Sequence, residues 1–103
     1  MSWTFASTVD AINGRDILGV DCGGRRIALY RLGGDFFATS DACPHQGASL
    51  SDGCIVSHFV ECAAHFALFD IRTGVAAGGP TTNSVKVFPT RVENGEIHVD
   101  IDG

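Results

Sequence analysis

Basic residues are missing from the middle of this 103-residue chain, where no Lys or Arg occurs between Leu32 and Ile71. The charged side chains of that segment are all acidic: Asp35, Asp41, Asp52, Glu61 and Asp70. Over the whole chain, 7 basic residues stand against 12 acidic ones, which gives a net charge of −5. Nucleic acids and anionic membranes are bound through clustered Lys and Arg. The charge pattern therefore argues against both as partners.

We also expect neither a secretory leader nor a membrane span. The first residues, Met1 to Phe5, lack the basic and then apolar stretches of a signal peptide. No apolar run approaches the ~20 residues that cross a bilayer. We therefore expect a soluble, cytoplasmic protein. Cytoplasmic thiols stay reduced, so the four cysteines indicate metal binding in preference to disulfides.

The chain contains no phosphate-binding loop, dinucleotide fingerprint or nucleophile elbow. It does contain two motifs that each pair a cysteine with a nearby histidine: Cys43-Pro44-His45 and Cys62-Ala63-Ala64-His65. Residues 46–61 separate them. Thiolates suit iron–sulfur clusters and zinc, while neutral imidazole suits zinc, copper and iron. The candidate metal ligands are therefore Cys43, His45, Cys62 and His65.

Two kinds of centre use such a set. A Rieske [2Fe–2S] cluster has two Cys on one iron and two His on the other, which would place Cys43 and Cys62 together and His45 and His65 together. Structural zinc sites usually pair Cys with a nearby Cys and close with paired His. Because each pair here mixes Cys with His, the pattern favours the cluster, with zinc as the alternative. The remaining cysteines and histidines are expected to be free thiols and non-ligands: Cys22, Cys54, His58 and His98.

Short apolar segments separated by turns recur along the chain. We expect one helical turn within 7–13 and strands over 3–6, 17–22, 26–32, 36–39, 55–56, 59–61, 67–70, 84–88, 90–93 and 97–101. Asn94-Gly95 predicts a type I′ hairpin turn, and the alternation that follows puts His98 on the polar face. This spacing is typical of an antiparallel β-sandwich or barrel. We predict an all-β fold and a single domain over 1–103, in which about 40–70 forms a small inserted sub-domain that binds the cluster.

Short motifs around the candidate ligands and beyond them match a known family over nearly the whole chain. They are Asp41–Gly47, Leu50–Gly53, Val60–His65, Phe69-Asp70, Thr73-Gly74, Gly79-Pro80, Phe88-Pro89 and Val92–Gly95. With these motifs the chain resembles a Rieske-type ferredoxin, in particular the ferredoxin component of bacterial multicomponent aromatic-ring-hydroxylating dioxygenases. The resemblance implies the Rieske iron–sulfur fold, a β-sandwich with one [2Fe–2S] cluster per chain.

The resemblance also implies a function. It predicts a monomeric one-electron carrier, not an enzyme in its own right, whose partners are an NADH-dependent flavoprotein reductase and a terminal oxygenase. No further base, nucleophile or mononuclear metal triad accompanies the candidate cluster ligands, so substrate chemistry is expected elsewhere. The alternative within the same fold is the Rieske small subunit of a nitrite-reductase-type enzyme.

Two departures from the family pattern occur in the second motif. Pro usually follows the second Cys and Gly usually follows the second His, whereas this chain has Ala63 and Phe66 there. Rieske proteins of respiratory complexes carry two further Cys that bridge the loops. The matching positions are Ala48 and Ala64, so we expect no such disulfide.

The same comparison bears on the redox potential and on docking. High-potential respiratory proteins have hydroxyl-bearing Ser and Tyr shortly after the second His, where this chain has Ala67 and Phe69. We therefore expect a potential near the low end of the Rieske range, on the order of −150 mV.

The residues beside the ligands are uncharged, Phe66 among them, and the surrounding segment is acidic. We expect a small apolar contact patch within a negative field.

Overall fold

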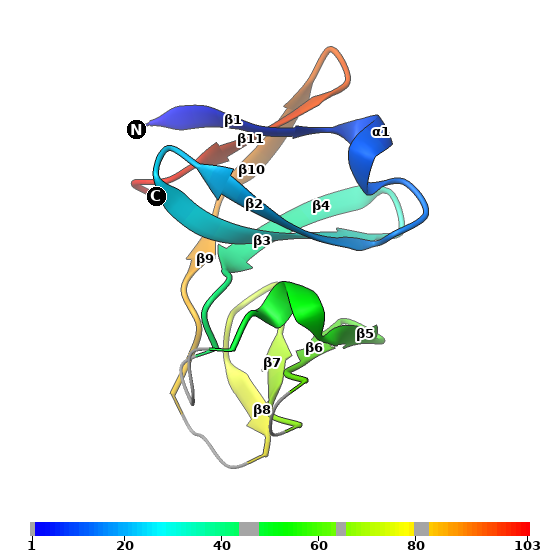
Figure 1. The fold of residues 1–103 in the computed structure, drawn as a ribbon, viewed down its shortest axis with the longest axis vertical. Helices are drawn as coiled ribbons and strands as arrows, with labels where there is room; N and C mark the ends of the chain where they lie inside the picture. Colours follow the sequence, from blue (N-terminus) through cyan, green and yellow to red (C-terminus); the bar gives the residue numbers. More distant parts are fainter. Residues whose placement is uncertain (1, 44–47, 64–65, 80–82) are drawn as a thin grey trace.

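The structure, a computed structural model, describes residues 2–43, 48–63, 66–79 and 83–103. In these ranges the backbone forms mainly short β-strands arranged in three antiparallel sheets (Figure 1). The elements in chain order are β1 (Trp3–Thr8), α1 (Val9–Ile12), β2 (Ile17–Cys22), β3 (Arg25–Leu32), β4 (Asp35–Ser40), the 3-10 helix η1 (Leu50–Asp52), β5 (Cys54–Val56), β6 (Phe59–Glu61), β7 (Leu68–Asp70), β8 (Ala76–Gly78), β9 (Val87–Phe88), β10 (Thr90–Glu93) and β11 (Glu96–Asp100).

The first sheet has the order β1-β11-β10 and joins the two ends of the chain. Its β10–β11 hairpin turns at Asn94 and Gly95, whose φ angles of 52° and 76° are both positive, as a type I′ turn requires. On the return strand Ile97 and Val99 are fully buried. The Asn94-Gly95 pair therefore predicted the turn, and the alternation after it predicted the inward face of β11.

The second sheet has the order β2-β3-β4-β9, and β3 lies at its centre. Successive side chains of a strand point to opposite faces. Ile27 and Leu29 pack into the core shared with the first sheet, while Ala28 and Tyr30 pack into the core that contains the candidate cysteine ligands. The two cores of the molecule are therefore the two faces of β3.

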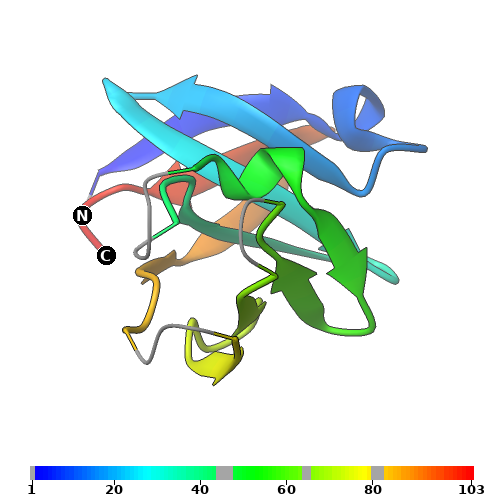
Figure 2. The ribbon, with the colours of Figure 1, turned by 60° about the horizontal axis from the view of Figure 1, so that its bottom comes forward.

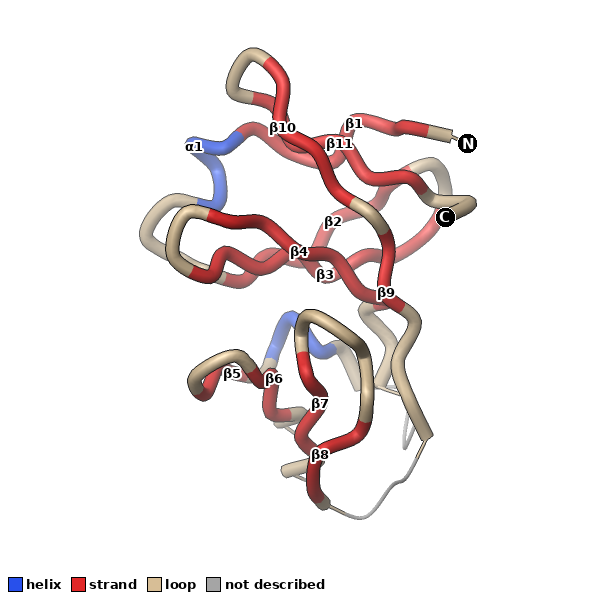
Figure 3. The backbone as a smooth tube through the Cα atoms, turned by 180° about the vertical axis from the view of Figure 1, so that it is seen from behind, coloured by secondary structure: helices blue, strands red, loops and turns tan. Residues whose placement is uncertain are grey.

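The third sheet, β5-β6-β7-β8, is built from the segment between β4 and β9. Figures 1 and 3 show it as a separate layer below the second sheet, and Figure 2 turns this layer to the front. The chain leaves the second sheet at Ser40 and returns at Lys86, and the Ser40 N–H donates to the Lys86 carbonyl at 2.9 Å. Both candidate ligand pairs are carried by this inserted segment.

The predicted all-β architecture with antiparallel sheets is confirmed, and β2 and β10 have the predicted bounds. Two elements were not predicted, η1 and β8, and the third sheet runs past residue 70 to Gly78.

The expectation of a solvated His98 is wrong in part. Its side chain is 19% exposed and packs edge-on against the Phe5 ring, with 6.1 Å between ring centroids. No helix among the described residues is long and apolar enough to cross a membrane.

Candidate metal centre

Two loops, residues 43–48 and 62–67, carry the candidate ligands, and the described residues that close them are arranged in the same way. Each loop connects two residues that face each other in an antiparallel pairing: Ala42 with Ser49, and Glu61 with Leu68. The second loop thus connects the two strands of the β6–β7 hairpin. The first loop connects only the isolated Ala42–Ser49 pair, after which η1 begins.

The cysteine stands first in each loop and closes it. The Cys43 N–H donates to the Ala48 carbonyl at 2.7 Å, and the Cys62 N–H donates to the Ala67 carbonyl at 2.8 Å. Both bonds span five residues, so the two loops are matched turns across two matched pairings. This repetition of the cysteine environment is not visible in the spacing of the ligands, which differs between the two motifs.

Both candidate thiol ligands point into the same core. Cys43 is 1% exposed and Cys62 is fully buried, and they share this core with Leu50, Val60 and Phe69. An isolated thiolate in such an apolar setting would carry a large desolvation cost. A bound metal offsets that cost, because it supplies the opposite charge and keeps the thiol deprotonated. The two thiol positions therefore fit one iron of a [2Fe–2S] cluster.

His45 and His65, the candidate imidazole ligands, lie outside the described residues. Their place in the sequence is nevertheless informative, because each falls within one of the two matched turns. One thiol and one imidazole per turn, with two turns meeting at one core, is the donor set of a Rieske centre.

Phe66 follows His65 and has a backbone conformation that side chains disfavour. Its φ is 58°, and its N–H donates to the Cys62 carbonyl at 3.0 Å. Glycine adopts this left-handed region freely, whereas a bulky residue is strained there by about 1–2 kcal/mol. The family's usual Gly at this position thus has a geometric reason, and the turn keeps that geometry here despite Phe66. The ring is 69% exposed and forms part of the outer surface of the loop.

Gly79 supports the end of the second loop from outside. A Cβ placed on Gly79 would lie 2.6 Å from the Cα of Ala67, and the φ of Gly79 is +94°. Both the close approach and the backbone conformation require glycine. Gly79 therefore packs against the residue that closes the Cys62 turn. The neighbouring Pro80 of the same motif lies outside the described residues.

Asp41 closes the base of the first loop. Its side chain is fully buried and accepts hydrogen bonds from the Ser51 N–H at 2.8 Å and from Arg26 Nε at 3.1 Å. Its own carbonyl accepts from the Leu50 N–H at 2.6 Å. One carboxylate thus ties the two ends of the Cys43 loop together and anchors them to β3 through Arg26.

We expect Asp41→Ala to lower the free energy of unfolding by about 2–3 kcal/mol, because it leaves the part-buried Ser51 N–H without an acceptor and removes the charge-assisted bond from Arg26. Denaturant unfolding of the apo and cluster-loaded proteins measures this. Asp35→Ala, an exposed Asp at the start of β4, serves as the control and should change stability by less than about 0.5 kcal/mol. Equal stability of the two variants would show that Asp41 does not hold the loop.

The acidic segment is less negative than its sequence indicates. Arg26 pairs with Asp41, and Arg72 lies 3.5 Å from Asp70, with His58 at 3.7 Å. Burial alone would raise the pKa of Asp70, but hydrogen bonds from Arg72 and the positive charges of Arg72 and His58 hold that pKa below its ordinary value. Cations from outside the segment therefore compensate two of its five acids.

The other two cysteines do not belong to the core that contains Cys43 and Cys62. Cys22 is buried in the core on the far face of β3, and its thiol lies 3.6 Å from the Phe5 carbonyl. Burial raises the pKa of this thiol, so it is expected to stay protonated and unreactive. Cys54 is exposed on β5, and neither cysteine is in a disulfide.

Sequence reasoning found the ligand motifs but missed the residues that support them. In the sequence, Asp41 counts only as one of the acidic residues of the segment, although it also begins the family motif Asp41–Gly47. Nothing in the sequence marks its burial. From the sequence, Ala48 and Ala67 are notable only for lacking a thiol and a hydroxyl. In the structure their backbone carbonyls accept the hydrogen bonds that close the two turns.

Comparison with known proteins identifies the family. The Rieske [2Fe–2S] domain matches residues 2–89. The ferredoxin component of the naphthalene 1,2-dioxygenase system of Pseudomonas putida is 35% identical over 98% of this chain and 97% of its own.

Solved structures agree with this match. The ferredoxin of carbazole 1,9a-dioxygenase from Nocardioides aromaticivorans superposes with a TM-score of 0.89 at 27% identity, over 96% of this chain and 97% of its own. The ferredoxin in a complex with the oxygenase of carbazole 1,9a-dioxygenase has a TM-score of 0.86 at 35% identity, over 94% and 91%. The chain therefore belongs to the Rieske [2Fe–2S] domain family, and within it to the ferredoxins of aromatic-ring dioxygenase systems.

Proposed function

We propose that this chain passes single electrons from an NADH-dependent flavoprotein reductase to a terminal ring-hydroxylating oxygenase. The observation that carries the proposal is its likeness to dioxygenase ferredoxin components along nearly the full length of both chains. A solved complex of reduced oxygenase with oxidised ferredoxin contains a ferredoxin 35% identical to this chain. The chain is an electron-transfer component, and the oxygenase supplies the substrate chemistry.

We infer that Cys43 and Cys62 bind one iron of the [2Fe–2S] cluster and that His45 and His65 bind the other. When bound, the cluster supplies a centre that takes up and releases one electron. The chain's own residues place this centre between core and surface: the two matched turns fix the thiols in the core, while Phe66, in the second turn, is exposed. We propose that an electron enters and leaves near Phe66, without opening of the core.

Residues 1–103 are proposed to act as one ferredoxin domain, with about 40–70 as the cluster-binding sub-domain. The chain would work as a monomer in the cytoplasm, where NADH feeds the reductase. A permanent subunit of a larger enzyme, such as a nitrite reductase, is the functional alternative that the experiment must separate.

The test is reconstitution with purified components. The cluster-loaded chain is expected to elute as a monomer, to accept one electron from a flavoprotein ferredoxin reductase and NADH, and to pass it to a terminal oxygenase of an aromatic-ring dioxygenase system. Product formation should depend on this chain and should saturate with its concentration. Obligate co-purification with a large partner, or a cluster that no flavoprotein reductase reduces, would contradict the proposal.

Phe66 is expected to lie in the contact with a partner. Weak redox complexes have small interfaces, and this ring is the most exposed large apolar side chain of the described residues. Phe66→Ala should lower partner turnover about 3–10-fold, the effect of losing ~1 kcal/mol of contact, while the visible spectrum of the cluster stays unchanged. Rates at limiting protein should also fall once the ionic strength passes roughly 0.1 M.

The control for this variant is Phe5→Ala on β1, which removes an equally large exposed ring from the first sheet, in the other half of the molecule. It should leave turnover unchanged. Rates that respond neither to Phe66→Ala nor to salt would show that another face docks.

A further inference from the structure

An open pocket lies beside the first cluster loop, where the inserted segment meets the second sheet. Its volume is about 350 Å³, and its lining includes Arg25, Arg26, Ser40, Asp41, Ser49 and Phe88. Ala42 also lines it, and the Ala42–Ser49 pairing forms the base of the loop that carries Cys43 and His45. Any group bound in this pocket would contact the loop of the candidate cluster ligands directly.

The pocket is basic, although the protein as a whole is acidic. The Arg26 guanidinium donates through Nε to Asp41 at 3.1 Å, and its Nη1 lies 3.9 Å from Asp21. A guanidinium has five N–H donors, so others remain for a bound group. Arg25 is exposed and forms no ion pair within the described part of the chain. Lys86 extends over the Phe88 ring at the pocket wall, with its Nζ 5.1 Å from the ring centroid. Lys86 is a neighbour of the pocket and not part of its lining. Together with the two lining arginines it gives three cations against two carboxylates, Asp41 in the lining and Asp21 beside Arg26.

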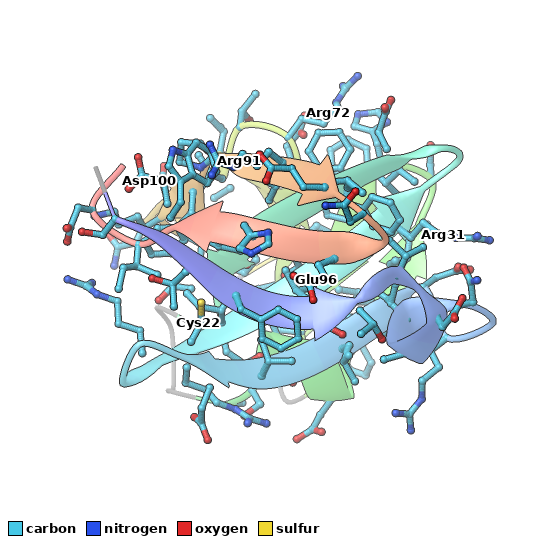
Figure 4. All side chains as sticks on the ribbon, turned by 90° about the horizontal axis from the view of Figure 1, so that it is seen from above. Cys22, Arg31, Arg72, Arg91, Glu96 and Asp100 are labelled. Carbon is cyan, nitrogen blue, oxygen red and sulfur yellow. The ribbon has the colours of Figure 1, made fainter. Side chains whose placement is uncertain are left out.

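The other arginines do not form such a group. Arg31, Arg72 and Arg91 lie well apart from one another in Figure 4, and each pairs with a carboxylate close to it in the structure. Arg15 stands in the turn before β2, at the opposite end of that strand from Arg25. The surplus of positive charge is therefore concentrated at the pocket.

We propose that this pocket receives a carboxylate side chain of a redox partner protein and so sets the orientation in which the partner meets the cluster. The inference rests on the proposed function. Guanidinium groups match a carboxylate through paired N–H donors, and the hydroxyls of Ser40 and Ser49 add donors at the same opening. The ferredoxin then offers its partner one positive contact, this basic pocket, and one negative contact, the exposed Asp52 of η1.

A complementary pair of patches determines orientation better than a uniform negative surface. A partner rotated by half a turn would place its acid against an acid of the ferredoxin, and like charges in contact suppress the wrong arrangement. The expectation of a purely negative field around the cluster thus changes to one of a polar contact with a defined direction.

The test uses the cluster-loaded protein and two substitutions that remove charge from the pocket without touching the Asp41 bond, Arg25→Gln and Lys86→Gln. The double variant should lower the second-order rate constant for electron exchange about tenfold at low ionic strength in one of the two half-reactions, with reductase or with oxygenase. Its rate at saturating partner and its visible spectrum should stay the same. Arg15→Gln is the matched control and should change neither rate, because it removes an exposed Arg elsewhere that has no ion pair with any residue the structure describes.

The possible failures are distinguishable. If the unmodified protein exchanges electrons with neither partner, the proposed function is wrong. If it exchanges electrons but the double variant and Arg15→Gln give the same rates in both half-reactions, the docking inference is wrong. If millimolar inorganic phosphate alone shifts the backbone NMR signals of the pocket and the double variant abolishes that shift without changing either rate, the pocket binds a small anion and the inference is wrong.

Discussion

Replacing either His45 or His65 by Ala is expected to give a protein without its red-brown cluster. Two imidazoles complete the coordination of one iron, and neither turn offers a second nitrogen or sulfur donor to replace a lost one. Because metal binding contributes to folding of the site, the inserted segment should also become less stable. Visible absorption, iron and sulfide content, and hydrogen exchange of residues 40–70 measure the outcome.

His58→Ala is the control for these variants. His58 belongs to the same segment and lies 3.7 Å from Asp70, outside both turns, so its loss should leave the spectrum intact. A His45→Ala protein that keeps a full Rieske spectrum would remove His45 from the ligand set. A protein that takes up zinc in a stoichiometric amount but forms no cluster under iron and sulfide would favour the zinc alternative.

The midpoint potential is expected near the low end of the Rieske range, on the order of −150 mV. Hydrogen bonds to the cluster sulfurs stabilise the added electron and raise the potential. Ala67 and Phe69 occupy the positions where high-potential Rieske proteins have hydroxyl groups, and both are fully buried in the core of the two candidate cysteines. Phe69→Tyr and Ala67→Ser should therefore each raise the potential, as a spectroscopic redox titration would show.

Phe59→Tyr is the matched control for Phe69→Tyr. Phe59 stands at the opposite end of β6 from Cys62, beside the turn to β5, so a hydroxyl there should leave the potential unchanged. A midpoint well above zero in the unmodified protein would contradict the prediction. An equal shift for Phe59→Tyr and Phe69→Tyr would show that the effect does not come from a bond at the cluster.

Local patterns in the sequence were sufficient to predict much of the fold. Asn94-Gly95 predicted its turn because few residues accept two successive positive φ angles, and the apolar runs of β2 and β3 predicted strands buried by packing. β8 could not be predicted, since Ala76–Gly78 has little strand preference and forms a strand only because β7 pairs with it.

The ligand motif was equally clear in the sequence, but the surroundings of the site were not. Arg26 and Asp41 meet because they extend the β3–β4 register by one residue beyond the Ile27–Ser40 pair, and the Asp41 N–H donates to the Arg26 carbonyl at 3.1 Å. The hairpin was predicted, but the burial of the Asp41 carboxylate at its end was not. The distribution of charge was misjudged because counting charges along one segment omits cations that the fold brings to it from other strands.

The hydrogen bond between Ser40 and Lys86, described above, has a consequence for how such chains can vary in length. It fixes both ends of the inserted segment, so a change in the number of residues between them alters mainly the entropy of closing that loop. This cost grows only with the logarithm of loop length, about 0.6 kcal/mol for each doubling. Insertions and deletions in this segment should therefore leave the pairing of β4 with β9 almost unaffected. The two turns themselves have no such freedom, because the bond from each cysteine to the alanine five residues later fixes their length.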